Sequence, residues 1–393
     1  MTPPQDGPTE STMEHYVSPE PFEPHAAVRL TPEQERYYLA SQWQLMWWKL
    51  RKHRLAVASG FVIAGLYLVA IFGEFLAPST LEDRRVEYAY APPQRVHLVS
   101  DEGVRFWPFV YGIHGKRNPE TLRRYYVEDR ARIYPIRLFT RGEPYRMWGL
   151  FASDIHLLGV ADGGTLFLLG ADALGRDLLS RIVYGTRISM TIGLVGVGMS
   201  FVFGLLIGVV SGYYGGWVDN LIQRTIEILR SFPSIPLWMA LAAALPSSWS
   251  PLQTYMGITV VLSLIGWTGL ARQVRGKILS LREEDFATAA VLIGASRWRV
   301  MTRHLLPSFM SHIIVSLTLA VPGMILGETS LSFLGLGLRP PVTSWGVLLR
   351  EAQNVQAVAF HPWLLTPVFF VIVTVLAYNF VGDGLRDAAD PYA

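Results

Sequence analysis

Long apolar runs separated by charged loops organise this sequence. The runs cover 55–73, 188–212, 231–271, 307–338 and 363–382. The first contains 19 residues without a charge, which as a helix spans about 28 Å, the thickness of a bilayer core. The uncharged run at 231–271 is too long for one crossing, and the Pro-rich segment 246–251 divides it. The pattern therefore predicts six membrane-spanning helices.

The same pattern sets the fold class and the orientation. Continuous apolar runs are typical of helices, so we expect an all-α integral membrane protein carrying a mixed or irregular extracytoplasmic insert. Basic residues precede the first run, and more of them lie between 272 and 303. Because basic residues in short loops stay on the cytoplasmic side, both loops are expected there. Six crossings then place both termini in the cytoplasm.

The sequence between and around the runs predicts further domains. Residues 1–30 are rich in proline and acidic residues and are expected to be a disordered tail. An aromatic, basic stretch at 31–54 predicts an amphipathic helix at the membrane interface. The first membrane helix is expected at 55–77, an extracytoplasmic insert at 78–168, and a membrane core with five further spans at 169–391.

Composition agrees with a membrane protein and excludes several functions. Hydrophobic residues make up 51% and charged residues 17% of the chain, against about a quarter charged in soluble domains. The net charge of +3 is too small to indicate nucleic-acid binding, and the absence of cysteine excludes disulfides and thiol catalysis. No P-loop, HExxH or GxSxG pattern occurs. We therefore predict no enzymatic activity and no cofactor or metal in this chain.

A charged loop at 282–307 lies between two apolar runs. Phe286, Ala289, Ala290 and Ile293 recur at helical spacing and form an apolar stripe. Gly294 can end this helix in a left-handed turn, and Ser296 can cap the next one. The stripe either inserts into a soluble partner or rests on lipid headgroups. The candidate contact residues are Glu284, Asp285, Phe286, Thr288, Ala289, Ala290, Gly294, Ala295 and Ser296.

The loop and four other segments resemble one transport family. Thr288-Ala289-Ala290, Gly294 and Leu306-Pro307 resemble the coupling loop of ATP-binding-cassette (ABC) importer permeases, with Thr288 replacing a glutamate. The other segments resemble the second permease subunit of dipeptide and oligopeptide importers, with Ala171 replacing a threonine. They are 170–189, 212–224, 328–337 and 382–391. The resemblance covers 31–79 and 168–391.

The resemblance implies a type I importer fold in a bacterial inner membrane. It also implies a homologous second permease, two ABC ATPase subunits that bind ATP and Mg, and an extracytoplasmic solute-binding protein. The expected solute is a peptide; a nickel complex, an oligosaccharide or an opine-like solute is the alternative within the class. A self-contained secondary transporter is the alternative of a different class.

Three charged groups beside or within the apolar runs call for an explanation. Glu328 lies inside a predicted span, where an acid is costly, so it either lines or gates the pathway or ties two helices together. Asp172, Arg176, Asp177 and Arg181 have mixed signs at helical spacing, so we expect a solvated helix leading into the second span, or a docking surface or latch. The acidic and basic residues at 224–230 are interpreted as an ion-pair ladder where the third span begins.

Overall fold

The structure is a computed structural model that describes residues 36, 39–101, 103–160, 163–340 and 342–389. The chain divides into two units, Met1–Leu45 and Met46–Ala393. The tail predicted at 1–30 lies outside the described residues. Within the segment 31–54, helix α2 covers Gln42–Lys52 and ends in three basic residues, Lys49, Arg51 and Lys52.

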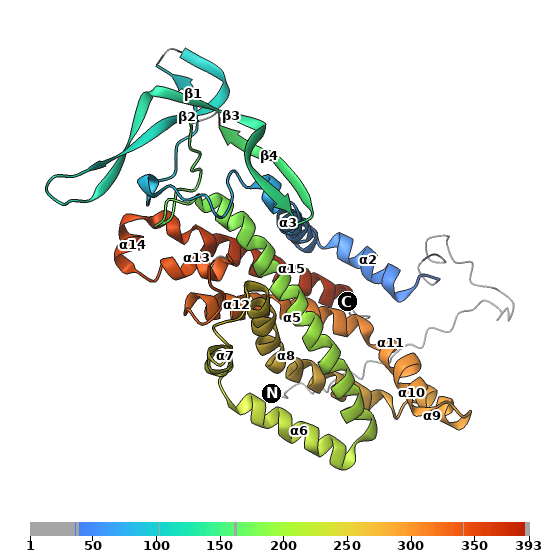
Figure 1. Cartoon of the computed structure of the whole chain (residues 1–393). Coiled ribbons are helices and arrows are strands. Elements are labelled where there is room, and N and C mark those ends of the chain that lie inside the picture. Colours follow the sequence, from blue (N-terminus) through green and yellow to red (C-terminus); the bar gives the residue numbers. More distant parts are fainter. Residues whose placement is uncertain (1–35, 37–38, 102, 161–162, 341, 390–393) are drawn as a thin grey trace, which may run out of the picture. The chain divides into compact units, whose positions relative to one another are not determined.

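Among the described residues, five helices of the second unit are long and apolar enough to cross a membrane (Figure 1). They are α3 (Arg54–Ile71), α5 (Leu178–Tyr214), α8 (Pro251–Leu281), α12 (Met310–Phe333) and α15 (Thr366–Ala389), the last preceded by the 3-10 turn Pro362–Leu365. Their most apolar windows have mean hydropathies of 1.5 to 2.3. The predicted helical membrane fold is therefore confirmed.

The segment predicted as the third span forms a shorter helix. Helix α7 (Ser234–Ala243) has 10 residues, about 15 Å in length and half a bilayer core. Pro233 precedes it and Pro246 follows it, and neither can donate a backbone hydrogen bond. The charged residues before it lie on a separate amphipathic helix, α6 (Gly216–Ser231), so the ladder at 224–230 is not the start of a span.

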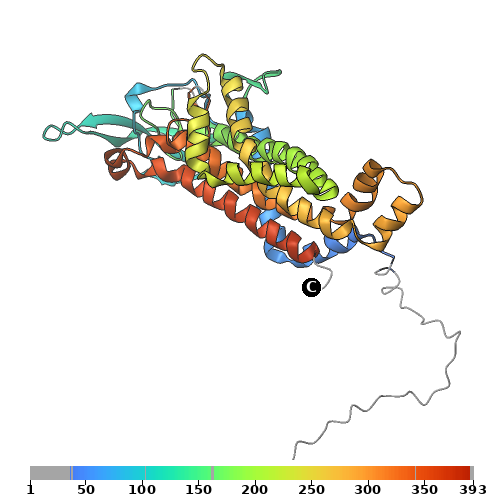
Figure 2. The same cartoon turned by 90° about the horizontal axis from the view of Figure 1, so that it is seen from below.

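The long helix α5 packs closely along α8. Gly204, Gly208 and Gly212 lie on the side of α5 that faces α8, and a Cβ added to Gly208 would come within 2.6 Å of the Ala271 carbonyl oxygen. Small residues at this spacing let two helix backbones approach closely in a membrane. Figure 2 shows the long helices running side by side. Helix α5 is therefore held closely against α8 along these glycines.

Short helices lie at both ends of the bundle. After α8 come α9 (Asp285–Leu292), α10 (Arg297–Arg299), a π-helical turn (Val300–Leu305) and α11 (Leu306–Ser308). Near the start of α5 lie α4 (Gly73–Leu76), the 3-10 turn Val86–Tyr88, α13 (Trp345–Glu351) and α14 (Val355–Phe360). Within the predicted first span, 55–77, α3 ends at Ile71 and α4 follows after Phe72.

The insert contains an antiparallel sheet in the order β1-β2-β3-β4 (Figure 1). Its strands are β1 (His97–Ser100), β2 (Gly103–Arg117), β3 (Arg124–Met147) and β4 (Phe151–Val160). The first half of β3 pairs with β2 and the second half with β4. Val110, Ile136 and Leu166 form part of its buried core. The described strands of the insert therefore form an antiparallel meander in which β3 is shared by two hairpins.

Candidate functional site

The loop between α8 and α12 folds as helix, turn and helix. Glu284 precedes α9 without a side-chain capping bond, and Gly294 follows the helix with a φ of 89°. This left-handed conformation favours glycine. The Ser296 Oγ accepts a hydrogen bond of 3.3 Å from the Arg299 N–H and so caps α10. The predicted glycine turn and serine cap are both confirmed.

Most bulky apolar side chains of α9 and its turn face outward. Of the predicted stripe, Phe286 is 44% and Ile293 85% exposed, and Ala289 is also exposed. Ala290 instead lies on the buried face of the helix, together with Ala287. Val291 and Leu292 add to the exposed set, Leu292 at 81%. These side chains form what we call the apolar tip: Phe286, Ala289, Val291, Leu292 and Ile293.

The buried face holds α9 against the membrane helices. Ala287 and Ala290 belong to a buried cluster with Val209 of α5, Ile278 of α8 and Met301 of the π-helical turn. Alanine side chains let the helix backbone lie close to its neighbours, and packed contacts of this kind transmit displacement because protein interiors are dense. The loop helix therefore shares one packed core with α5, α8 and the π-helical turn.

Charged residues surround the apolar tip. Glu284, Asp285, Thr288 and Ser296 are exposed, whereas Ala295 is half-buried and donates its N–H to the Ala290 carbonyl at 3.0 Å. The two carboxylates lie at the amino end of α9, where the helix dipole favours negative charge. On the other side Arg299, Arg303 and His304 line a hollow of about 330 Å³ beside Gly294. An exposed apolar centre with a charged rim is the anatomy of a protein interface.

Glu328 connects three helices inside the bundle. It is fully buried, and its Oε1 accepts hydrogen bonds of 2.6 Å from Ser332 Oγ and from Ser344 Oγ. Ser344 caps α13, and the next residue, Trp345, donates its N–H to Ser189 Oγ of α5 at 3.1 Å. Among the described residues, the Glu328 Oε2 has no hydrogen-bond partner. Glu328 thus ties α12 to α13, which is in turn tied to α5.

The charged residues at the start of α5 are buried, so the predicted solvated helix is wrong. Asp172 is fully buried, and its Oδ2 accepts from Arg176 Nε at 2.6 Å and from Arg181 Nη1. Arg181 also donates to Glu351 Oε1 of α13 at 2.9 Å. The spacing of the charges suggested an exposed helix face. The burial could not be predicted from the sequence, because Glu351, a partner of Arg181, lies 170 residues away along the chain. These four residues, Asp172, Arg176, Arg181 and Glu351, form what we call the outer ion cluster.

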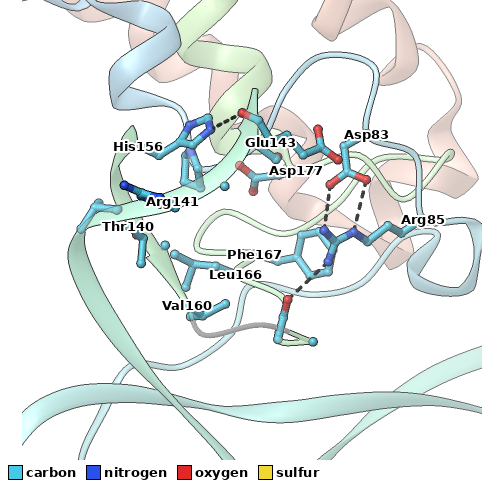
Figure 3. Close-up of a pocket in the computed structure, with 17 residues that line it drawn as sticks. Asp83, Arg85, Thr140, Arg141, Glu143, His156, Val160, Leu166, Phe167 and Asp177 are labelled. Atoms are coloured by element: carbon cyan, nitrogen blue, oxygen red, sulfur yellow. Dashed lines mark hydrogen bonds and ion pairs between the residues drawn. The ribbon is translucent and has the colours of Figure 1, made fainter. Parts of the chain in front are cut away.

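Asp177 caps α5 beside a cavity of about 260 Å³ that the sheet also lines (Figure 3). Its Oδ2 accepts from the Ser180 N–H at 2.7 Å and from the Ser180 Oγ at 2.6 Å. Burial raises the pKa of Asp177 to about 6. Across the cavity, the ring nitrogens of His156 contact the carbonyl oxygens of Ala77 and Glu143 at 2.6 and 3.0 Å. These contacts attach the sheet to the chain that follows α4.

One further ion pair at this end was missed by sequence reasoning. Arg187 of α5 donates two hydrogen bonds of 2.5 Å to the Glu74 carboxylate, and its guanidinium lies 4.4 Å from the Trp148 ring centroid. Burial alone would raise the pKa of Glu74, but the hydrogen bonds and charge of Arg187 outweigh it and lower the pKa. The position of Glu74 at the end of an apolar run was the signal in the sequence that this residue needs a partner. The identity of that partner could not be predicted, because Arg187 lies 113 residues away.

The fold and the site together define a class of protein. A bundle of apolar helices, a packed loop helix with an exposed apolar tip, and a separate lobe at the other end describe an integral membrane protein. Residues 204–392 match the family model of the binding-protein-dependent transport system inner membrane component, and residues 41–93 match the N-terminal membrane domain of oligopeptide transport permease C.

Individual relatives agree with these models. The chain is 43% identical to an oligopeptide transport system permease protein OppC of Haemophilus influenzae, over 56% of this chain and 69% of that protein. It is 31% identical to a dipeptide transport system permease protein DppC of Alkalihalophilus pseudofirmus, over 95% and 96%. A glutathione transport system permease protein GsiD of Pectobacterium atrosepticum is 39% identical over 57% and 72%. The chain belongs to this family of binding-protein-dependent importers and is an ABC importer permease subunit.

Proposed function

We propose that this chain is one of two homologous permease subunits of a bacterial inner-membrane peptide importer. The segment 232–250, which contains α7, would complete a sixth crossing, so that both termini and the loop 282–307 lie in the cytoplasm. Arg297, Arg299 and Arg303 support this orientation, because arginine in short loops is retained on the cytoplasmic side. Residues 78–168 then form the extracytoplasmic insert, and 169–391 the permease core.

The apolar tip carries the proposal that a soluble ATPase binds the loop. Its side chains lie on a helix whose other face is anchored in the bundle, so exposing them costs hydration free energy that a partner would recover. Two ABC ATPase subunits would bind ATP and Mg, and each would bind the loop of one permease subunit. This chain itself catalyses no reaction and binds no cofactor.

The loop would convert ATPase movement into a change of access. Closure of the ATPases on ATP would push α9, and the buried contacts of Ala287 and Ala290 would carry the displacement into α5 and α8. The solute pathway would lie between the two permeases, opening outward on ATP binding and inward after hydrolysis. Glu328 in this proposal positions α12 and α13 and does not touch the solute, since its Oε1 accepts hydrogen bonds from two serines of this chain.

The solute is proposed to be a peptide delivered by an extracytoplasmic binding protein. The names of three similar proteins, which carry oligopeptides, dipeptides and glutathione, support a peptide over a nickel complex or a sugar. Uptake of labelled di- to pentapeptides in cells lacking this chain and in restored cells tests the solute. Restoration of nickel uptake alone would contradict it.

The ATPase proposal is tested by co-purification of the tagged full chain from its native membrane. The Leu292→Glu, Ile293→Glu double variant places charges on the apolar tip and should lose the ATPase subunits while remaining in the membrane. Val355→Glu, at an 80% exposed site on α14, is the matched control and should retain them. Equal recovery of ATPase with both variants would overturn the proposal.

A further inference from the structure

The residues that flank α9 also hold the corner between α5 and α6. Arg282, just before the helix, donates from Nη1 to the carbonyl oxygens of Gly212 and Tyr213 at 3.2 and 3.5 Å. Arg297, just after it, has its guanidinium 5.9 Å from the ring centroid of Tyr214. These carbonyls are at the end of α5, where cations interact favourably with the helix dipole. The residues on both sides of α9 therefore contact the carboxyl end of α5.

A partly buried ion pair connects α8 to α6 in the same region. Arg275 of α8 donates to both carboxylate oxygens of Asp219, from Nε at 2.6 Å and from Nη2 at 2.5 Å. Ser211 of α5 donates its hydroxyl to the Asp219 Oδ1, and Gln223 of α6 donates to that hydroxyl at 3.1 Å. Asp219 is only 8% exposed. One carboxylate thus joins α5, α6 and α8.

The electrostatics suit a permanent connection. The hydrogen bonds from Arg275 are the largest cause that lowers the pKa of Asp219, so the carboxylate stays ionised at physiological pH. A bidentate guanidinium–carboxylate pair fixes direction as well as distance. By contrast, the other ion pair of α6, Arg224–Glu227, stays within that helix and is exposed at 78% and 48%.

Helix α6 leads directly to the short apolar helix α7. Phe232 is extended and Pro233 precedes α7, so only two residues separate the helices. Ile226 of α6 is fully buried against Trp267 and Ala271 of α8. Two contacts therefore join α6 to α8, the apolar one at Ile226 and the ion pair at Asp219. A displacement of α8 would move α6 as one body only if both contacts hold.

We propose that the Asp219–Arg275 pair is a positioning contact that makes α6, and α7 behind it, follow α8 when the loop is pushed. The inference rests on the proposed role of the loop, since without a gripping ATPase there is no push to relay. Neither residue meets the solute or the ATPase; the pair acts through the helices it joins. Its loss should leave ATP hydrolysis running while transport fails.

The test measures ATP hydrolysed and peptide transported by the complete importer reconstituted in liposomes. Asp219→Asn keeps the shape but removes the charge, and should raise the ratio of ATP to peptide about tenfold. Glu227→Gln makes the same acid-to-amide change on the same helix at the exposed local pair, and should leave the ratio unchanged. An unchanged ratio in Asp219→Asn would overturn the proposal.

A second variant covers the case in which Asp219→Asn fails to fold. A lone buried charge destabilises, whereas removal of both partners is often tolerated. Asp219→Asn with Arg275→Gln should therefore restore the amount of importer in the membrane and still show the raised ratio. If abundance and ratio both return to normal, the pair has only a structural role and the proposal is overturned.

Failure here is distinguishable from failure of the loop proposal. Loss of ATPase subunits from the Leu292→Glu, Ile293→Glu variant depends on docking alone and does not require the ion pair. If that variant retains the ATPases, the proposed function fails. If it loses them and Asp219→Asn remains fully coupled, only the relay fails.

Discussion

The two ends of α5 lie in different surroundings. At its amino end, the outer ion cluster and Asp177 are buried, with charges joined across α5 and α13. At its carboxyl end, the Asp219–Arg275 pair joins α5, α6 and α8, the loop packs through an apolar cluster, and the largest side chains of the apolar tip point into solvent. Both ends of the helix are therefore held by buried charge, but only the carboxyl end lies beside exposed apolar side chains that a partner could bind.

This difference assigns separate tasks to the two ends. Buried ion pairs are directional and break at high cost when one partner is lost, so they suit a region that keeps its geometry. Exposed apolar side chains on an anchored helix suit a region that binds and releases a partner. Substitutions at the outer end should therefore change stability first, whereas those at the loop should change transport first.

The largest effect is expected from Gly294→Pro. Proline fixes φ near −65° and cannot adopt the 89° found here. The resulting strain, about 3 kcal/mol or more, would misplace the apolar tip and lower uptake about 100-fold. Radiolabelled peptide uptake and membrane immunoblots check this. Normal uptake with normal abundance would contradict the role assigned to the turn.

At the outer end, Arg181→Met should chiefly lower stability. It removes one of the two cations at the fully buried Asp172 and leaves that charge undercompensated, a change that costs about 3–5 kcal/mol. The thermal midpoint of the purified importer should fall by several degrees. Arg141→Met, at a pair with Asp154 whose arginine is 85% exposed, is the control and should cause almost no change. Similar midpoints for the two variants would contradict a buried cluster.

Asp177 gives the outer end a pH dependence. With a folded-state pKa of about 6, it binds a proton at pH values where the unfolded chain has released it. Stability is therefore present at low pH and is lost as pH rises through 6, by about 1–2 kcal/mol between pH 5 and 7.5. Asp177→Asn keeps a good helix cap and cannot ionise. The midpoint of the native chain relative to this variant should fall over that range; parallel curves would contradict the buried carboxylate.

The smallest effect is expected from Glu328→Gln. Glutamine can still accept from both serines through its amide oxygen, but its NH₂ group takes the place of the buried Oε2 that has no partner among the described residues, so stability should fall by about 1 kcal/mol. Uptake should fall in proportion to the amount of folded importer. If transport is lost while the thermal midpoint is unchanged, Glu328 acts in the pathway instead. If neither changes, both the tie and the pathway interpretations fail.

Sequence patterns recovered the parts that depend on neighbours along the chain. Apolar run length identified the long helices, and Gly294 and Ser296 marked the turn and the cap of the loop. The shortness of α7 was also encoded, in Pro233 and Pro246, but the uncharged run hid it. Local sequence signals were sufficient for helices, turns and caps, because each of these depends on residues that are close together along the chain.

Patterns failed where the partner is distant. Glu351 lies 170 residues from Arg181, Arg187 lies 113 from Glu74, and Arg275 lies 56 from Asp219. A sequence pattern shows only neighbours along the chain, so it could not reveal these pairs. The sheet was equally hidden, because the first and second halves of β3 pair with different strands and its alternation is interrupted by bulges.

Cross-linking tests most directly whether a separate motor holds the loop. The chain contains no cysteine, so Ile293→Cys places a single thiol on the apolar tip of an otherwise unmodified subunit. With a short thiol-reactive cross-linker, this variant should join to an ATP-hydrolysing subunit, and the yield should change when ATP is added. Leu150→Cys, an exposed site on the insert, should not. Cross-links from Ile293→Cys to lipid alone, or to an ATPase equally from Leu150→Cys, would contradict the account.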